Sequence, residues 1–213
     1  MSKIFISYRR SDSRKDTERL HDHLCNAYGS KNVFLDVDGH ITPGNDFREA
    51  LQDAIAQSEV ILVVIGQRWL DIRHADNPQA RRLDDPSDFV RLEIETALNS
   101  EGKHIIPVLV NEANMPGADA LPSSLERLAY LQAMNLRPNP DFHNDLAQLL
   151  DVIDAHMPDD APISLASVLP EQRRSLRQYD TRSSLRSFYL TVGLVSVFIV
   201  GLLGFGVVML RNN

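Results

Sequence analysis

Short apolar runs and amphipathic stretches alternate along most of the chain. The apolar runs are rich in β-branched and aromatic residues, which favours strands; they read KIFISY, NVFLDV, EVILVVIG, HIIPVLV and, more weakly, YLQAMNL. Between them apolar residues return every three or four positions, which predicts helices over residues 12–28, 46–57, 88–99 and 141–156. This alternation predicts an α/β fold, a parallel sheet with helices on both faces in a flavodoxin-like arrangement.

Ligands of such sheets bind beyond the carboxyl ends of the strands. The segments that follow the first four predicted strands read SYRRSD, DVDGHITPGND, GQRWLD and NEANMPG. We therefore expect the functional residues of the domain in these four loops.

The pattern changes after residue 156, where the predicted domain of residues 1–156 ends. Residues 157–187 form a predicted linker, proline-containing at first and then arginine-rich, and residues 188–210 carry no charge. At about 1.5 Å per residue, this uncharged stretch is long enough to cross a hydrocarbon core of about 30 Å as a transmembrane helix. Because arginines cluster before it, the positive-inside rule predicts a single-pass C-terminal anchor with the domain in the cytoplasm.

Composition and motifs exclude several function classes. The formal charge of -7 argues against nucleic acid as a partner, and a single cysteine, Cys25, excludes an intramolecular disulfide or a cysteine zinc cluster. The histidines are scattered or share no helix face, so we expect no metal site. Phosphate loops, dinucleotide fingerprints and nucleophile elbows do not follow the strands, which argues against P-loop enzymes, dehydrogenases and serine hydrolases.

The helix predicted over residues 88–99 carries two glutamates in different settings. Arg91 lies four residues before Glu95 and can pair with it on a helix. At the same spacings the neighbours of Glu93 carry no charge; they are Phe89, Val90, Thr96 and Ala97. Glu93 is therefore either an ordinary surface carboxylate or a functional one.

The order of the motifs closely resembles a TIR domain of bacterial type. The resemblance covers residues 3–156 and rests on FISYRR with Asp12, VFLDVDGHITPGNDF, VILVVIGQRW, SDFVRLEIETAL and HIIPVLV. It implies a five-stranded parallel sheet and association between TIR domains, hence a homo-oligomer. It also implies one of two functions: adaptors that bind other TIR domains, or enzymes that cleave NAD⁺ at the nicotinamide ribosyl bond, in some cases cyclising the ADP-ribose.

The resemblance identifies Glu93 as the catalytic residue. Enzymatic TIR domains carry a glutamate four residues after an aromatic, usually Trp, on the helix that follows the third strand. Here this pattern falls on Phe89 and Glu93, with Phe89 offering a surface on which nicotinamide can stack. Nicotinamide leaves NAD⁺ as a neutral ring and needs no proton, so one carboxylate that stabilises the oxocarbenium charge could carry much of the reaction. NAD⁺ is then the substrate, and no cofactor is expected.

The other predicted substrate-binding residues each have a second interpretation. Arg9 and Arg10 could meet phosphate oxygens or be solvated surface arginines. In TIR domains the loop of Asp36, Gly44 and Phe47 opens the site and contacts the next subunit, although a Pro-Gly pair could be only turn chemistry. Trp69 could stack a base or cap the core.

These observations predict a membrane-anchored NAD⁺ hydrolase that is activated by self-assembly, with a role in bacterial defence or cell suicide. The alternative is a non-enzymatic TIR adaptor that recruits other TIR proteins to the membrane. A third class is a membrane effector in which the span itself acts and the TIR domain gates it.

Overall fold

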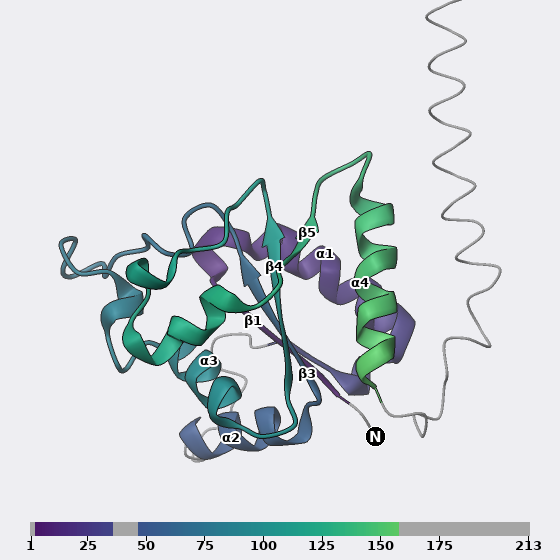
Figure 1. Ribbon diagram of the computed structural model, residues 1–213, viewed down its shortest axis with the longest axis horizontal. Helices are drawn as coiled ribbons and strands as arrows, with labels where there is room; N and C mark the ends of the chain where they lie inside the picture. The colour runs from purple at the N-terminus through teal and green to yellow at the C-terminus, as the bar shows by residue number, and fades with distance from the viewer. Residues whose placement is uncertain (1–2, 36–46, 158–213) are drawn as a thin grey trace, which may run out of the picture. The chain divides into compact units, whose positions relative to one another are not determined.

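The computed structural model describes residues 3–35 and 47–157, with a parallel five-stranded sheet at its centre (Figure 1). The strand order is β2-β1-β3-β4-β5, and every pair of neighbours runs parallel. The strands are β1 (Ile4–Tyr8), β2 (Val33–Leu35), β3 (Val60–Ile65), β4 (His104–Val110) and β5 (Met134–Leu136). This confirms the predicted α/β fold.

Among the described residues, four α-helices cover the two faces of the sheet: α1 (Arg10–Tyr28), α2 (Phe47–Gln57), α3 (Phe89–Asn99) and α4 (Phe142–His156). α1 and α4 lie together on one side, where the Tyr28 hydroxyl donates to the Asp154 carboxylate at 2.7 Å, and α2 and α3 lie on the other (Figure 1). Short 3₁₀ helices add to the connections: η1 (Ser30–Asn32), η2 (Arg82–Asp84), η3 (Ala118–Ala120) and η4 (Ser123–Tyr130).

The core on the α2 and α3 side forms because the strands are apolar on both faces. Alternate β3 residues, Ile61, Val63 and Ile65, point to this side and are at most 2% exposed. Ile94 of α3 and Leu125 of η4 pack into the same layer. α3 is therefore held between the sheet and the segment that leads to β5, which turns one whole face of this helix inward.

The C-terminal predictions lie outside the described residues. In the part of the chain that the structure describes, no helix is long and apolar enough to cross a membrane. The span predicted over residues 188–210 and nearly all of the linker predicted over residues 157–187 are not among these residues.

Candidate functional site

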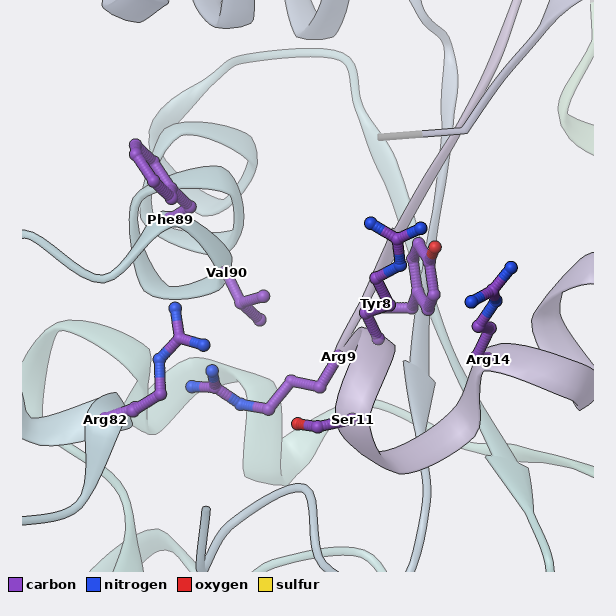
Figure 2. A pocket seen from close by; sticks show the side chains of 8 residues that line it. Tyr8, Arg9, Ser11, Arg14, Arg82, Phe89 and Val90 are labelled. Carbon is purple, nitrogen blue, oxygen red and sulfur yellow. The ribbon is translucent and has the colours of Figure 1, made fainter. Parts of the chain in front are cut away.

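A cavity of about 410 Å³ opens at the carboxyl edge of the sheet (Figure 2). Its walls come from the end of β1, the first turn of α1, η2 and the start of α3, and its lining is rich in arginine: Tyr8, Arg9, Arg10, Ser11, Arg14, Arg82, Phe89 and Val90. The position agrees with the rule that ligands of parallel sheets bind beyond the carboxyl ends of the strands.

The chain turns sharply from β1 into this cavity. Arg9 has extended backbone angles, φ -100° and ψ 111°, and its carbonyl oxygen accepts hydrogen bonds from the amides of Asp12 and Ser13. Ser13 has non-helical angles, φ -123° and ψ 19°, which separates the first turn of α1 from the rest of the helix. This short turn carries Arg10 and Ser11 at the cavity wall.

Asp88 is the residue that joins the separate walls of the cavity. Its carboxylate accepts hydrogen bonds from both terminal nitrogens of Arg9, at 2.8 and 3.1 Å, and lies 3.1 Å from Nε of Arg82. It also caps α3 by accepting from the Arg91 amide at 3.1 Å. The side chains of Arg9 and Asp88 are 2% and 0% exposed, so this is a buried ion pair, and Arg82 is a second cation beside the same carboxylate.

The structure separates the two arginines that the sequence grouped together. Arg10 is exposed and lines the cavity. The solvated alternative is wrong for Arg9, because Asp88 holds its guanidinium in the interior. Arg9 also lies near Trp69, with its guanidinium carbon 5.8 Å from the ring centroid.

Trp69 lies in the core, 1% exposed, among the apolar residues of β3, α3 and η4. Of its two interpretations, capping the core is the one that the structure shows. A base can stack on this ring only if the side chain leaves the core, so the assignment of Trp69 to substrate binding has no support in the geometry.

Glu93 is 1% exposed, so the surface alternative for this residue is wrong. Its helix is enclosed between the sheet and η4, and its buried face also carries Val90, Ile94 and Ala97. The carboxylate lies one helical turn beyond Phe89, which lines the cavity and is 42% exposed, but Glu93 is not part of the cavity lining.

Glu95 makes the contact that helix spacing predicts. Nε of Arg91 donates to its carboxylate at 2.7 Å, and the Ser124 hydroxyl of η4 also donates to it. The predicted pairing of Arg91 with Glu95 is confirmed, and the contact with Ser124 makes Glu95 a structural residue that links α3 to η4.

A second cavity, of about 470 Å³, adjoins the first. It shares Ser11, Arg82 and Phe89 with it, and its own lining comes from the connection between β3 and α3: Ile72, Arg73, His74, Ala75, Asp85, Ser87 and Asp88. Nε2 of His74 lies 3.4 Å from the Asp85 carboxylate. Hydrogen bonds from the hydroxyl and amide of Ser87 lower the pKa of Asp85, which keeps this carboxyl ionised.

Arg82 and Asp88 were missed as site residues by the sequence analysis. The predicted loop after β3 ended at Asp71, whereas the connection runs to Asp88 and folds back on itself through an antiparallel bridge between Arg73 and Arg81. One sequence signal was available, because an aspartate immediately before a helix is a typical N-cap.

Three further predictions concern residues of which little or nothing is described. Asp36 and Gly44 lie outside the described residues, and Phe47 begins α2 without a described side chain. Within residues 3–35 and 47–157, no three His, Cys, Asp or Glu side chains gather as a metal site requires.

Comparison with known proteins places this geometry in a family. The family model described as TIR domain matches residues 4–150. Among solved structures 52 chains are similar, including one from the structure of the activated Roq1 resistosome directly recognizing the pathogen effector XopQ (TIR domains). That likeness has a TM-score of 0.52 and 17% identity, over 72% of this chain and 99% of the other, and shows the fold alone. No curated protein sequence matches.

Proposed function

The chain belongs to the TIR domain family, and from this premise we propose that it is an NAD⁺ nucleosidase that self-assembly activates. The reaction breaks the bond between the ribose C1′ and the nicotinamide nitrogen. The bonding electron pair leaves with nicotinamide, water adds at C1′, and the products are ADP-ribose, nicotinamide and a proton.

The observation that carries this proposal is the carboxylate of Glu93, which α3 buries one turn beyond the arginine-lined cavity. Burying a carboxylate costs free energy that an apolar side chain of similar size would not cost. A glutamate at this position is therefore better explained by a role in catalysis than by a contribution to the stability of the fold. Its charge would stabilise the oxocarbenium ion that forms as nicotinamide departs.

The rest of the cavity fits a dinucleotide that carries a nicotinamide ring. Phe89 is 42% exposed at the cavity wall and offers a face on which the nicotinamide ring can stack. Arg10 and Arg82 bring positive charge to the same cavity, where the diphosphate of NAD⁺ needs partners.

The burial of Glu93 also supports control by assembly. Glu93 is 1% exposed and outside the cavity lining, so the ribose can reach its carboxylate only after the wall between them rearranges. Contact with a second TIR domain is the rearranging event that we propose. The predicted anchor at residues 188–210 would favour that contact, since tethered domains have a raised effective concentration. Loss of NAD⁺ in a cell would then serve defence or cell suicide.

The same burial favours a second candidate function, that of a TIR adaptor. In this case Glu93 stays inside the fold, the cavity has no catalytic role, and the domain recruits other TIR proteins to a membrane. The two functions differ in whether the charge of Glu93 matters for any reaction.

The test is nicotinamide release from NAD⁺ by the full chain in liposomes, at low and high protein density. Glu93→Gln keeps the size of the side chain and removes its charge, and Glu95→Gln makes the same change at the structural glutamate. We expect release at high density from wild type and Glu95→Gln, and a loss of about 100-fold or more in Glu93→Gln. Activity retained by Glu93→Gln would refute the catalytic assignment. If wild type and both variants release no nicotinamide at any protein density, the adaptor function is favoured.

A further inference from the structure

Two cavities meet at one arginine in this fold. The first is about 410 Å³ and the second about 470 Å³, each within the range of small-molecule sites. Arg82, Ser11 and Phe89 line both, so a ligand that extends from one cavity into the other must pass the guanidinium of Arg82. A ligand with two bulky halves and an anionic centre suits this arrangement.

Arg82 is better placed than Arg9 to bind an anion. Arg9 directs both terminal nitrogens at Asp88, and its side chain is 2% exposed. Arg82 approaches the same carboxylate with Nε 3.1 Å away, and its side chain is 40% exposed. The guanidinium of Arg82 is therefore accessible to a ligand, and Figure 2 shows it at the cavity wall beside Arg9.

The two cavities together have a positively charged lining, since five arginines line them against two aspartates, Asp85 and Asp88. Arg9 and Arg82 share the single carboxylate of Asp88, which neutralises one of the two guanidinium groups. Arg14 is offset by Glu18, whose carboxylate accepts from its Nε at 2.7 Å. Exposed Arg10 adds a further positive charge. A guanidinium presents paired donors that match phosphate oxygens, so a diphosphate suits the junction in charge and in geometry.

We propose that Arg82 binds the diphosphate of a dinucleotide where the two cavities meet, and that Asp88 is the residue that positions Arg82 for this contact. The nicotinamide riboside half then occupies the first cavity, because Val90, three residues before Glu93 on α3, lines that cavity and not the second. The adenosine half occupies the second cavity. The choice of a dinucleotide rests on the proposed function, whereas the phosphate contact is testable without turnover.

The first experiment titrates ADP-ribose into the full chain in detergent micelles by calorimetry. ADP-ribose carries the diphosphate but lacks nicotinamide, so binding is measured without cleavage. Arg82→Ala is expected to weaken binding by about 10-fold or more, the order expected when charge-assisted hydrogen bonds are lost. Arg82→Lys keeps the positive charge but loses the paired N–H donors of the guanidinium. Its affinity for ADP-ribose is expected to lie between those of wild type and Arg82→Ala.

Arg127→Ala is the matched control. Arg127 of η4 is exposed and lines neither of the two cavities. Its loss removes one charge and should change the affinity for ADP-ribose by no more than about twofold. Equal weakening by Arg127→Ala and Arg82→Ala would overturn the assignment, since it would reflect general charge. Wild-type affinity in both Arg82 variants would overturn it as well.

The variant Asp88→Asn tests whether Asp88 positions Arg82 or acts only through its charge, because the two roles predict opposite changes in the affinity for ADP-ribose. Asparagine still caps a helix well, so α3 keeps its N-cap while the junction gains one net positive charge. If Asp88 were only a counter-charge, the variant would bind ADP-ribose more tightly. If Asp88 positions Arg82, Asp88→Asn should weaken the binding of ADP-ribose by about 3-fold or more. In the Arg82→Ala background the same change should have no further effect on this affinity. Tighter binding by Asp88→Asn would refute the positioning role.

The proposed function and this inference can fail separately. If wild type releases no nicotinamide but Arg82→Ala still loses ADP-ribose binding, the phosphate site stands and the catalytic proposal fails. If wild type cleaves NAD⁺ while Arg82→Ala keeps both the affinity for ADP-ribose and the KM for NAD⁺, the catalytic proposal stands and the role of Arg82 fails.

Discussion

The carboxylate of Asp12 accepts a hydrogen bond from the backbone amide of Gly66, with Oδ2 and the nitrogen 2.9 Å apart. Its other oxygen accepts from the amide of Arg68, also at 2.9 Å. The first turn of α1 is thereby fixed to the loop that follows β3, at the sheet edge where the cavities open. A side chain at residue 66 has no room, because a Cβ there would lie 2.4 Å from Oδ2 of Asp12.

Gly66→Ala is therefore expected to destabilise the domain. The added methyl group must push the Asp12 carboxylate away, with loss of its hydrogen bonds, and overpacking of this kind costs about 1–3 kcal/mol. The free energy of unfolding, measured by urea denaturation of the full chain in detergent, checks this expectation.

The double variant tests the mechanism. Asp12→Ala alone loses two hydrogen bonds, at a cost of about 1–3 kcal/mol, but removes the group that clashes. Once Asp12 is alanine, Gly66→Ala should cost much less. Additive losses, to within about 0.5 kcal/mol, would mean that the two residues do not interact in the way described.

Asp145 is expected to make stability depend on pH in the acid range. Burial alone would raise the pKa of Asp145, but hydrogen bonds from the guanidinium and amide of Arg137, at 2.7 to 3.0 Å, lower it overall. A lowered folded pKa gives stability that is present above the unfolded value of 3.8 and is lost as pH falls through the folded pKa. Asp145→Asn should therefore be less stable than wild type at pH 7, by about 1–2 kcal/mol.

The gap between wild type and Asp145→Asn should narrow as pH falls below 3.8, because the unfolded chain takes up the proton first, and it should close below the folded pKa, where the native carboxyl is neutral as well. Unfolding curves at pH 7, 5, 4 and 3 measure it. A gap that keeps its full size at pH 3 would assign the loss to packing and not to charge. Arg14→Gln, which breaks an exposed pair with Glu18, is the control and should show little effect at any pH.

The elements of this fold were predictable wherever local pattern decides them. The helix predicted from residue 88 begins at Phe89 with Asp88 as its cap, because an aspartate before an apolar period is a strong local signal. The strand predicted weakly over YLQAMNL is wrong in its first half, since η4 runs to Tyr130 and β5 begins only at Met134. Short apolar runs suit a strand and a helical turn equally, and tertiary packing chooses between them.

The candidate site was predictable only in part, because its contacts join distant segments. Arg9 and Asp88 lie 79 residues apart in sequence and form one buried ion pair. Residue spacing holds no information about such a pair, so the sequence offers only phosphate binding or solvation as interpretations of Arg9. The burial of Trp69 was not predictable for a related reason. An aromatic side chain that follows a strand packs into the core or faces solvent according to the loop that covers it.

His104 is expected to respond to His156, whose ring stacks on it with centroids 3.9 Å apart. Desolvation first, and then the neighbouring charge of His156, lower the pKa of His104, while Glu59 opposes them. A lowered histidine pKa makes protonation cost stability, so this contribution is complete above the unfolded value of 6.5 and is lost as pH falls. His156→Gln should raise the pKa of His104 part of the way toward 6.5.

NMR titration of the His104 ring protons in the full chain measures this pKa. Glu59→Gln provides a control of opposite sign, because removing the acid should lower the pKa of His104 further. An unchanged pKa of His104 in His156→Gln would show that the charge of His156 does not contribute to the shift.

Phe89 is expected to affect substrate binding and hardly to affect stability. It is 42% exposed and lines both cavities, so the fold depends little on its side chain. If NAD⁺ is the substrate, Phe89→Ala should raise the KM by about 2- to 10-fold, the loss of one aromatic stacking contact, and change the free energy of unfolding by about 0.5 kcal/mol or less. Phe89→Trp restores a larger ring and should keep or lower the KM.

Tyr130→Ala is the matched control for Phe89→Ala. Tyr130 is 73% exposed and lines neither of the two cavities, so its removal should leave the KM for NAD⁺ unchanged. Initial rates of nicotinamide release across NAD⁺ concentrations give both constants. If Phe89→Ala and Tyr130→Ala behave alike while wild type is active, nicotinamide does not stack on Phe89, and the ring must be held by a different wall of the cavity.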